Sequence, residues 1–174
     1  SLWPVQHSGF SNHARRTQGR DRIVTVATLV CDTLVCDTSI LLYLGRIQHL
    51  HLLPQLYPTI LVPRPVVFEL DVGRSLQPEI VDPLRLSFAV IKTVAQAEID
   101  HLPANRLGHG ERSVIALARQ VNAAVAGLDD RQARLFAISL GLTVKGAVGL
   151  IVEAKRSSLI PSATDLLVAL RQSG

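Results

Sequence analysis

The chain has 174 residues, of which 48% are hydrophobic, 18% charged and 4% aromatic. This composition can bury one substantial core, which excludes a disordered chain and predicts a single folded domain. The formal net charge is +4, but four arginines and one aspartate in residues 1–25 carry most of it. The rest of the chain is near neutral, so its total charge gives little support for nucleic-acid binding.

Residues 1–25 contain Gly, Ser, Pro and Arg without an apolar period. We predict a flexible N-terminal extension there and a folded domain over residues 26–174. The apolar run at 23–31 is short and lacks a small-residue cleavage site, so we predict a strand rather than a signal peptide. No run is long enough for a membrane helix. Cys31 and Cys36 are too few for a disulfide framework or a zinc site, and a reducing cytoplasm fits best.

The stretch TLVCDTLVCDTSILLYL repeats a pentapeptide that ends first at Asp32 and then at Asp37. Because the repeat is odd in length, the two aspartates point to opposite faces of one continuous strand. Only Asp37 is followed by helical spacing of apolar residues, at Ile40, Leu41, Leu44 and Ile47. We predict a strand, then a helix capped by Thr38 or Ser39, with Asp37 at the junction. Asp32 is expected at a strand start or outside the core.

The next segment repeats the strand and helix order. Thr59–Val62 reads as a short strand, and a helix that contains Glu69 can begin at Pro65. The apolar spacing that distinguishes strands from helices is weakest over residues 74–107. There we predict a strand near Phe88–Val94 and a short helix over Ala95–Leu102.

The apolar spacing becomes clear again after residue 108. GHGERSVIALARQ predicts a helix with apolar residues on one face, and Glu111 lies on that face. AAVAGLD reads as a buried strand that ends at Asp129, and Asp130 is expected to cap a helix that stops at Gly141. LTVKGAVGLIVEAKRSSLI gives another strand and helix, and SATDLLVALRQ a last helix. This alternation predicts an α/β fold, a three-layer α/β/α sandwich around a mostly parallel sheet with right-handed crossovers.

Four acids occupy related positions in this scheme. Asp37 and Asp129 follow predicted strands, and Glu69 and Glu111 lie near helix starts. Ligands bind beyond the carboxyl ends of parallel strands, where converging acids repel one another unless a cation compensates them. Carboxylates in that number suit Mg²⁺ or Mn²⁺ with water and phosphate oxygens, and the chemistry implied is phosphodiester hydrolysis.

Each acid also has a structural alternative. Asp37 could be a helix cap, Glu69 and Glu111 could complement helix dipoles, and a cap is the preferred reading for Asp130. Other candidates are weaker still. We expect no metal pair from the histidines at 49 and 51, which share no helical face. His109, Arg131, Arg134 and Lys145 are expected to be solvated.

Several segments resemble PIN-domain proteins: DTS at Asp37, ILVPRPVVFE ending at Glu69, GHGERSVIALAR, and AGLDDRQARLFAISLGLTVKGAVGLIVEAKRSSLI. The similarity covers about residues 34–171. Its C-terminal block resembles a toxin-like subgroup. The long head and the repeated pentapeptide depart from the family pattern.

The resemblance implies an Mg²⁺- or Mn²⁺-dependent endoribonuclease for single-stranded RNA, often the toxin of a toxin–antitoxin pair. It implies an antitoxin protein as partner, and a homodimer. Asp37, Glu69, Glu111 and Asp129 match the acidic quartet, with Asp37 and Asp129 as direct ligands and the two glutamates holding water. Ser39 matches a supporting hydroxyl, and Asp130 is a further supporting candidate.

Two rival functions remain open from the sequence. The first is a catalytically inactive PIN-like module that binds RNA or protein. The second is another hydrolase built on the same acids, such as a phosphatase or a DNA-directed nuclease. Metal uptake would test the first rival, and competition between substrates the second.

Overall fold

The computed structural model of this chain describes residues 32–121 and 124–173. The predicted N-terminal extension at 1–25, the predicted strand at 23–31 and Cys31 lie outside the described residues. The domain division at residue 25 therefore stays a prediction.

Five strands and a series of helices alternate along the described chain. The strands are β1 (Thr33–Cys36), β2 (Thr59–Pro63), β3 (Ala89–Lys92), β4 (Ala124–Gly127) and β5 (Thr143–Lys145). The helices are α1 (Thr38–Arg46), α2 (Leu52–Leu56), α3 (Arg64–Leu76), α4 (Gln96–Asp100), α5 (His109–Gln120), α6 (Arg131–Ser139), α7 (Ala147–Arg156) and α8 (Ala163–Ser173). A single 3₁₀ turn, η1 (Pro83–Arg85), precedes β3.

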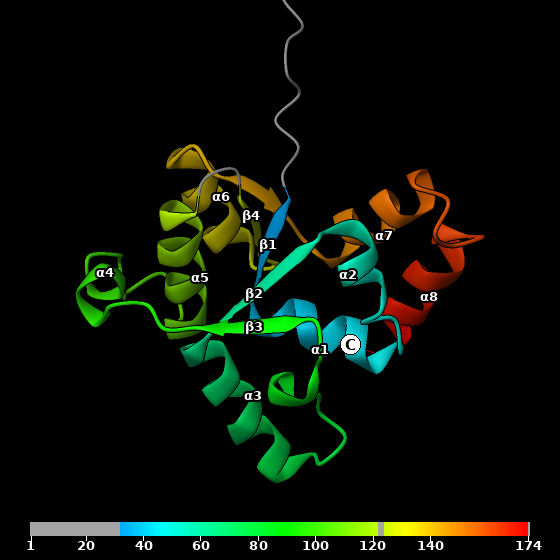
Figure 1. Cartoon of the computed structure of the whole chain (residues 1–174), viewed down its shortest axis with the longest axis horizontal. Coiled ribbons are helices and arrows are strands. Elements are labelled where there is room, and N and C mark those ends of the chain that lie inside the picture. The colour runs from blue at the N-terminus through cyan, green and yellow to red at the C-terminus, as the bar shows by residue number, and fades with distance from the viewer. Residues whose placement is uncertain (1–31, 122–123, 174) are drawn as a thin grey trace, which may run out of the picture.

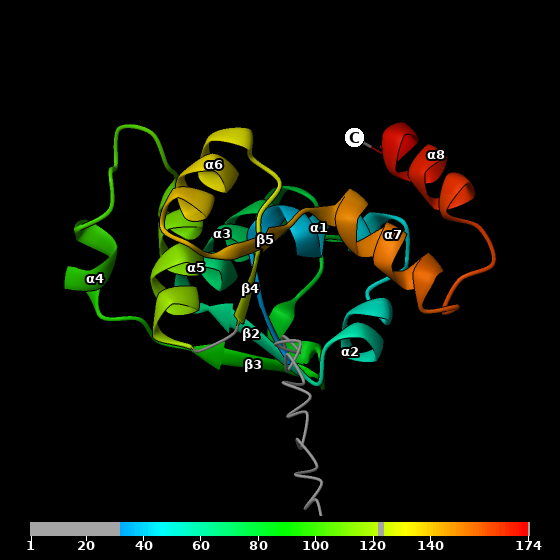
Figure 2. The ribbon, with the colours of Figure 1, turned by 90° about the horizontal axis from the view of Figure 1, so that it is seen from above.

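The sheet is wholly parallel, with strand order β3-β2-β1-β4-β5. Figure 1 shows β1 between its neighbours, and Figure 2 shows α5 and α6 on one side of the sheet with α1, α2 and α7 on the other. Helix α8 packs on α1 and α7, and α3 contacts both α1 and α5. The predicted three-layer α/β/α sandwich is confirmed.

Burial explains why β1 and β4 form the centre. All of β4 is buried, and Leu34, Val35 and Cys36 of β1 are fully shielded from solvent. Strands covered on both faces need continuous apolar runs, which both segments supply. This packing fixes the carboxyl ends of β1 and β4 beside each other, with Cys36 paired to Gly127.

Most predicted elements are present, with shifts at their ends. Strand β4 ends at Gly127 rather than at Asp129, because the chain leaves the sheet two residues earlier. The N-cap of α1 is Asp37, whereas Thr38 and Ser39 are already helical, so the predicted cap was wrong. The exposed position of Asp32 immediately before β1 confirms its placement outside the core.

Lys145 was expected to be a solvated surface residue, and this was wrong. Its ammonium donates to the Tyr57 hydroxyl over 2.9 Å and to Glu153 Oε1 over 2.6 Å. The Tyr57 hydroxyl in turn donates to Glu153 Oε2 over 2.8 Å. These three side chains join the end of α2, the end of β5 and the middle of α7. Such a contact is invisible in sequence because 88 positions separate Tyr57 from Lys145.

Within the described residues, no helix has the length and apolar character needed to cross a membrane.

Candidate functional site

Asp37 lies at the carboxyl end of the central strand and is only 3% exposed. Its backbone N–H donates to Gly127 O over 3.1 Å, which places the residue against the end of β4. Although Asp37 is the N-cap of α1, its side chain makes no hydrogen bond of the usual capping kind, and its only support from the helix start comes from the backbone N–H groups of Thr38 and Ser39. Capping of α1 accounts for only part of the surroundings of this carboxylate, because burial and the charges of Glu69 and Glu111 oppose its ionised form.

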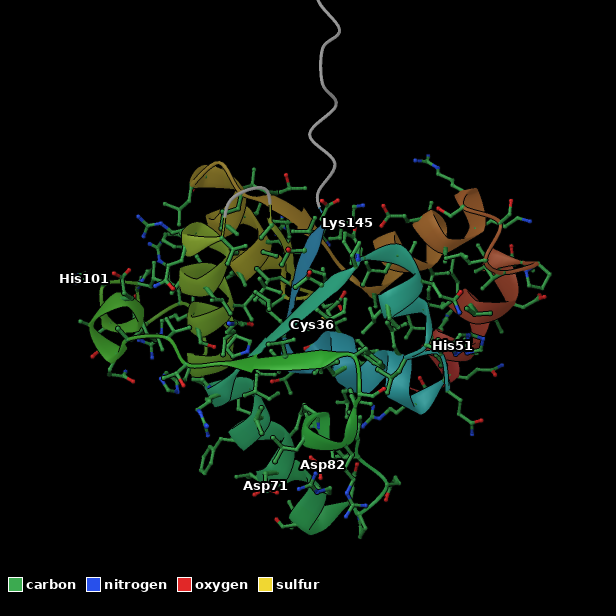
Figure 3. All side chains as sticks on the ribbon, viewed as in Figure 1. Cys36, His51, Asp71, Asp82, His101 and Lys145 are labelled. Carbon is green, nitrogen blue, oxygen red and sulfur yellow. The ribbon has the colours of Figure 1, made fainter. Side chains whose placement is uncertain are left out.

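The surroundings of Asp37 disfavour its ionised form. Burial raises the pKa of Asp37 to about 7. The negative charges of Glu69 and Glu111 act in the same direction, and the backbone N–H groups at the start of α1 act against it. Cys36, labelled at the centre of Figure 3, is affected similarly. Burial and the Asp37 charge raise the pKa of its thiol, so Cys36 stays protonated in the metal-free chain.

Glu69 leaves α3 toward the start of α1 and the start of α5. Its Oε2 accepts a hydrogen bond from the Thr38 hydroxyl, and its Oε1 accepts from Gly110 N–H over 2.8 Å. A Cβ atom at Gly110 would lie 2.4 Å from Glu69 Oε2. Glycine at this position permits the close approach, and a side chain there would push the Glu69 carboxylate away from the helix end.

Glu111 lies in the first turn of α5. Its Oε2 accepts from Gly108 N–H over 2.8 Å, so the residue helps to cap its own helix, a role that goes beyond the dipole complementation suggested by the sequence. Burial raises the pKa of Glu111, and the charges of Asp130 and Glu69 add to this effect. The Glu111 carboxylate therefore caps α5, and it also lies close enough to Glu69 for the two negative charges to interact.

Asp129 follows β4 and is held at the start of α7. Ala147 N–H donates to Oδ1 over 3.1 Å and to Oδ2 over 3.3 Å. A Cβ atom at Gly146 would lie 2.5 Å from Asp129 Oδ1, so a glycine again permits the close approach. Burial raises the pKa of Asp129, and Ala147 N–H and the charge of Arg134 oppose the increase.

The two supporting candidates differ in what they do. Asp130 caps α6, where its Oδ1 accepts from Ala133 N–H over 2.9 Å, which confirms the predicted cap. Its charge also raises the pKa of Glu111, so Asp130 lies near the carboxylates of Glu111 and Glu69. Ser39 is half-buried in the first turn of α1. His109, the first residue of α5, is exposed, as expected.

The sequence did not identify Thr38, Gly110 and Gly146 as partners of the acids. Their role depends on three helix starts meeting at the carboxyl ends of the strands. The only sequence signal is a glycine within the first residues of a helix or just before it, in GHGE and in KGAV.

The carboxylates fit a divalent cation by their chemistry. Asp37, Glu69, Glu111 and Asp130 are coupled through their charges, and Asp37 has no ion-pair partner within the described residues. Buried oxygen donors without a compensating charge are what a hard cation binds. Yet no three His, Cys, Asp or Glu side chains in the described ranges form a ready metal-binding group. Protein N–H and O–H groups hold Glu69, Glu111 and Asp129 instead.

The comparisons with known proteins agree with this fold. The family model DUF3368, described as a PIN domain, matches residues 33–174. No curated protein and no solved structure matches the chain significantly.

Proposed function

This chain belongs to the PIN-domain family, and we therefore propose that it is a metal-dependent endoribonuclease that cuts single-stranded RNA with Mg²⁺ or Mn²⁺. One observation carries the proposal. The carboxylate of Asp37 is buried at the carboxyl end of the central strand, next to the charges of Glu69 and Glu111. Such an arrangement costs stability when the carboxylate is ionised, and a bound cation would offset that cost.

In this proposal Asp37 and Asp129 are the direct ligands, and Glu69 and Glu111 hold and orient water. When bound, the cation supplies Lewis acidity, because it polarises the phosphodiester and lowers the pKa of the attacking water. Oxygen ligands favour Mg²⁺ or Mn²⁺ over softer ions.

The chain's own residues supply orientation. The Thr38 hydroxyl and Gly110 N–H fix both oxygens of Glu69, and Ala147 N–H fixes Asp129. A carboxylate held on rigid helix ends loses little freedom when it engages water or substrate. Asp130 remains a cap of α6 and shapes the charge around Glu111.

The biological role proposed is the toxin of a toxin–antitoxin pair, with an antitoxin protein as partner, a homodimer as the assembly and the cytoplasm as the compartment. The support is the resemblance of the C-terminal block, residues 126–160, to toxin-like members of the family. A test is growth arrest on expression of the chain, lost in Asp37→Asn. Growth without arrest on expression of the active chain would contradict the toxin role.

The enzymatic proposal is tested with labelled single-stranded RNA in Mn²⁺, Mg²⁺ or EDTA. We expect cleavage in either metal, none in EDTA, and none by Asp37→Asn. Asp32→Asn is the matched control, because the exposed Asp32 ends the first copy of the repeat and should be dispensable. Cleavage by Asp37→Asn at the unmodified rate would contradict the proposal.

The rival hydrolases are separated by substrate competition. Single-stranded DNA and a small phosphate ester are added in excess over the labelled RNA. We expect neither to be hydrolysed at the rate of RNA. Faster hydrolysis of the ester would favour a phosphatase, and of DNA a DNA-directed nuclease.

A further inference from the structure

The outer face of α3 carries an apolar groove that the catalytic proposal does not use. Its walls come from α3, η1 and β3, and it encloses about 430 Å³. The residues that line it are Arg64, Val67, Phe68, Asp71, Arg74, Leu84 and Ile91. Phe68 is 68% exposed and Leu84 is 67% exposed. Two large apolar side chains left open beside a groove indicate a binding surface.

The groove begins beside the acidic site. Phe68 directly precedes Glu69 in α3, but Glu69 turns toward Thr38 and Gly110 while Phe68 is open to solvent. Arg64, one helical turn before Phe68, is the first residue of α3 and follows the carboxyl end of β2. In the sheet β2 adjoins β1, which ends at Asp37. A polymeric ligand that lies across the carboxyl ends of the strands can therefore contact both the groove and the acidic site at Asp37.

The two ends of the groove differ in charge. At the far end Arg74 pairs with Asp71 and with Asp82, and Asp82 also contacts Arg85. Figure 3 shows Asp71 and Asp82 near each other there. Two cations and two anions balance, so this end offers no net charge.

The end near the acidic site is cationic. Arg64 Nε donates to Thr93 Oγ1 over 3.2 Å, and Arg64 makes no ion pair with any residue that the structure describes. Lys92, the last residue of β3, pairs in register with Pro63, the residue before Arg64. Lys92 is exposed and likewise unpaired within the described ranges. Ile91 lines the groove, so its strand neighbour Lys92 points to the other face of β3. Arg64 is therefore the cation that the groove presents at its end near the acids.

We propose that this groove is a subsite for the RNA strand, in which a base stacks on Phe68 while Arg64 contacts the adjoining phosphate. The inference rests on the proposed function. Single-stranded nucleic acids are bound by aromatic platforms beside cationic grooves. An anionic backbone explains the unpaired Arg64 beside the open ring of Phe68. A protein partner would instead use the whole exposed apolar row of α3, which continues from Phe68 through Val72 to Leu76, and the tests below separate the two occupants.

The first test measures binding of a fluorescein-labelled single-stranded RNA by anisotropy, with the full chain and with Ca²⁺ in place of Mn²⁺. RNA integrity is checked afterwards on a gel. Phe68→Ala should weaken binding about 5- to 150-fold, the range of one lost stacking contact. Phe68→Trp should bind as well as the unmodified chain, and Phe68→Leu should behave like Phe68→Ala. Val72→Ala, one turn further along α3, is the matched control and should bind normally.

The second test isolates the phosphate contact. Arg64→Gln should reduce the slope of log affinity against log salt by about 0.7, the value for one phosphate on a single strand. Arg64→Lys should restore the slope, because it restores the charge. An unchanged slope in Arg64→Gln would remove this residue from the subsite.

The outcomes separate the subsite from the proposed function. If the chain binds and cuts RNA but every Phe68 variant binds equally, the subsite is wrong and the nuclease stands. If Phe68→Ala and Leu76→Ala change the oligomeric state by light scattering and leave RNA affinity intact, the face is a protein interface and the subsite is wrong. If the unmodified chain neither binds nor cuts RNA, both are wrong.

Discussion

Asp37 is the residue where stability and the proposed chemistry oppose each other. Its pKa in the folded chain is about 7 against 3.8 for an ordinary aspartate. A carboxyl group whose pKa is raised on folding stabilises the protein only while it stays protonated. Above that range the folded chain has to hold a buried carboxylate beside other anions, and this favours unfolding.

Metal-free protein is therefore expected to lose stability as the pH rises from about 4 to about 7, by up to about 1.4 kcal/mol per pH unit. Burial also raises the pKa values of Glu111 and Asp129, so their effects have the same sign. Asp37→Asn should flatten the profile and increase the free energy of unfolding at pH 8 by on the order of 2 to 4 kcal/mol. Urea unfolding in EDTA at pH 5 and pH 8 measures this. A variant that is less stable at pH 8 would contradict the account.

Gly110 gives a second prediction at the residue scale. Gly110→Ala should lower RNA cleavage at least about tenfold, because the new methyl group would occupy the place of the Glu69 carboxylate. The protein should remain folded, since alanine is the better helix former. Cleavage rate and circular dichroism are measured together.

Gly149→Ala is the matched control. Gly149 also lies within a helix, and a Cβ atom there would meet only Lys145 side-chain carbons at 3.7 and 4.0 Å. We expect normal cleavage and a gain of about 0.5 to 1 kcal/mol in stability. Equal losses of activity in both glycine variants would mean that cleavage does not depend on the position in which Gly110 N–H holds the Glu69 carboxylate.

At the scale of elements, the sequence predicted the acids better than their partners. The positions of Asp37 and Glu69 at strand-to-helix junctions were predictable because a short apolar strand precedes each helix, and the Asp130 cap because it stands before a helical pattern. The five-residue helix α2 was missed because it contains Pro54 and is too short for a period. The glycine contacts of Glu69 and Asp129 were missed because they join elements that only folding brings together.

The cap of α6 allows a test of whether Asp130 also serves the cation. Asp130→Ala should lower the free energy of unfolding by about 1 kcal/mol, because Ala133 N–H loses its acceptor. Asp130→Ser should retain most of that stability, since serine can still cap. Both variants should cleave RNA. If Asp130→Ser is stable but inactive, the Asp130 charge belongs to the metal-binding group.

At the scale of the whole molecule, the contact of Tyr57 with Lys145 and Glu153 ties three elements on one side of the sheet. Tyr57→Phe should lower the free energy of unfolding by about 1 kcal/mol, because both charged partners lose a hydrogen bond. Cleavage should persist. Thermal unfolding of Tyr57→Phe and of the control Tyr43→Phe measures the difference. Equal stability of the two variants would contradict a structural role for this cluster.

The fold class was predictable because strands and helices alternate with clear apolar periods, and the parallel sheet follows from that alternation. The arrangement around the strand ends was not predictable in the same way. Whether four acids converge depends on strand order, on helix starts and on which backbone N–H groups they bind. The sequence placed the acids at the right edge of the sheet, and their present hydrogen bonds appear only in the structure.

The central claim is that Asp37 and Asp129 hold a divalent cation, and calorimetric titration of Mn²⁺ into the metal-free chain tests it most directly. The account predicts saturable binding in the unmodified chain and in Asp32→Asn, and its loss in Asp37→Asn and Asp129→Asn. Circular dichroism should show that all variants are folded. Undiminished Mn²⁺ binding by Asp37→Asn, or no binding by the unmodified chain, would contradict the account.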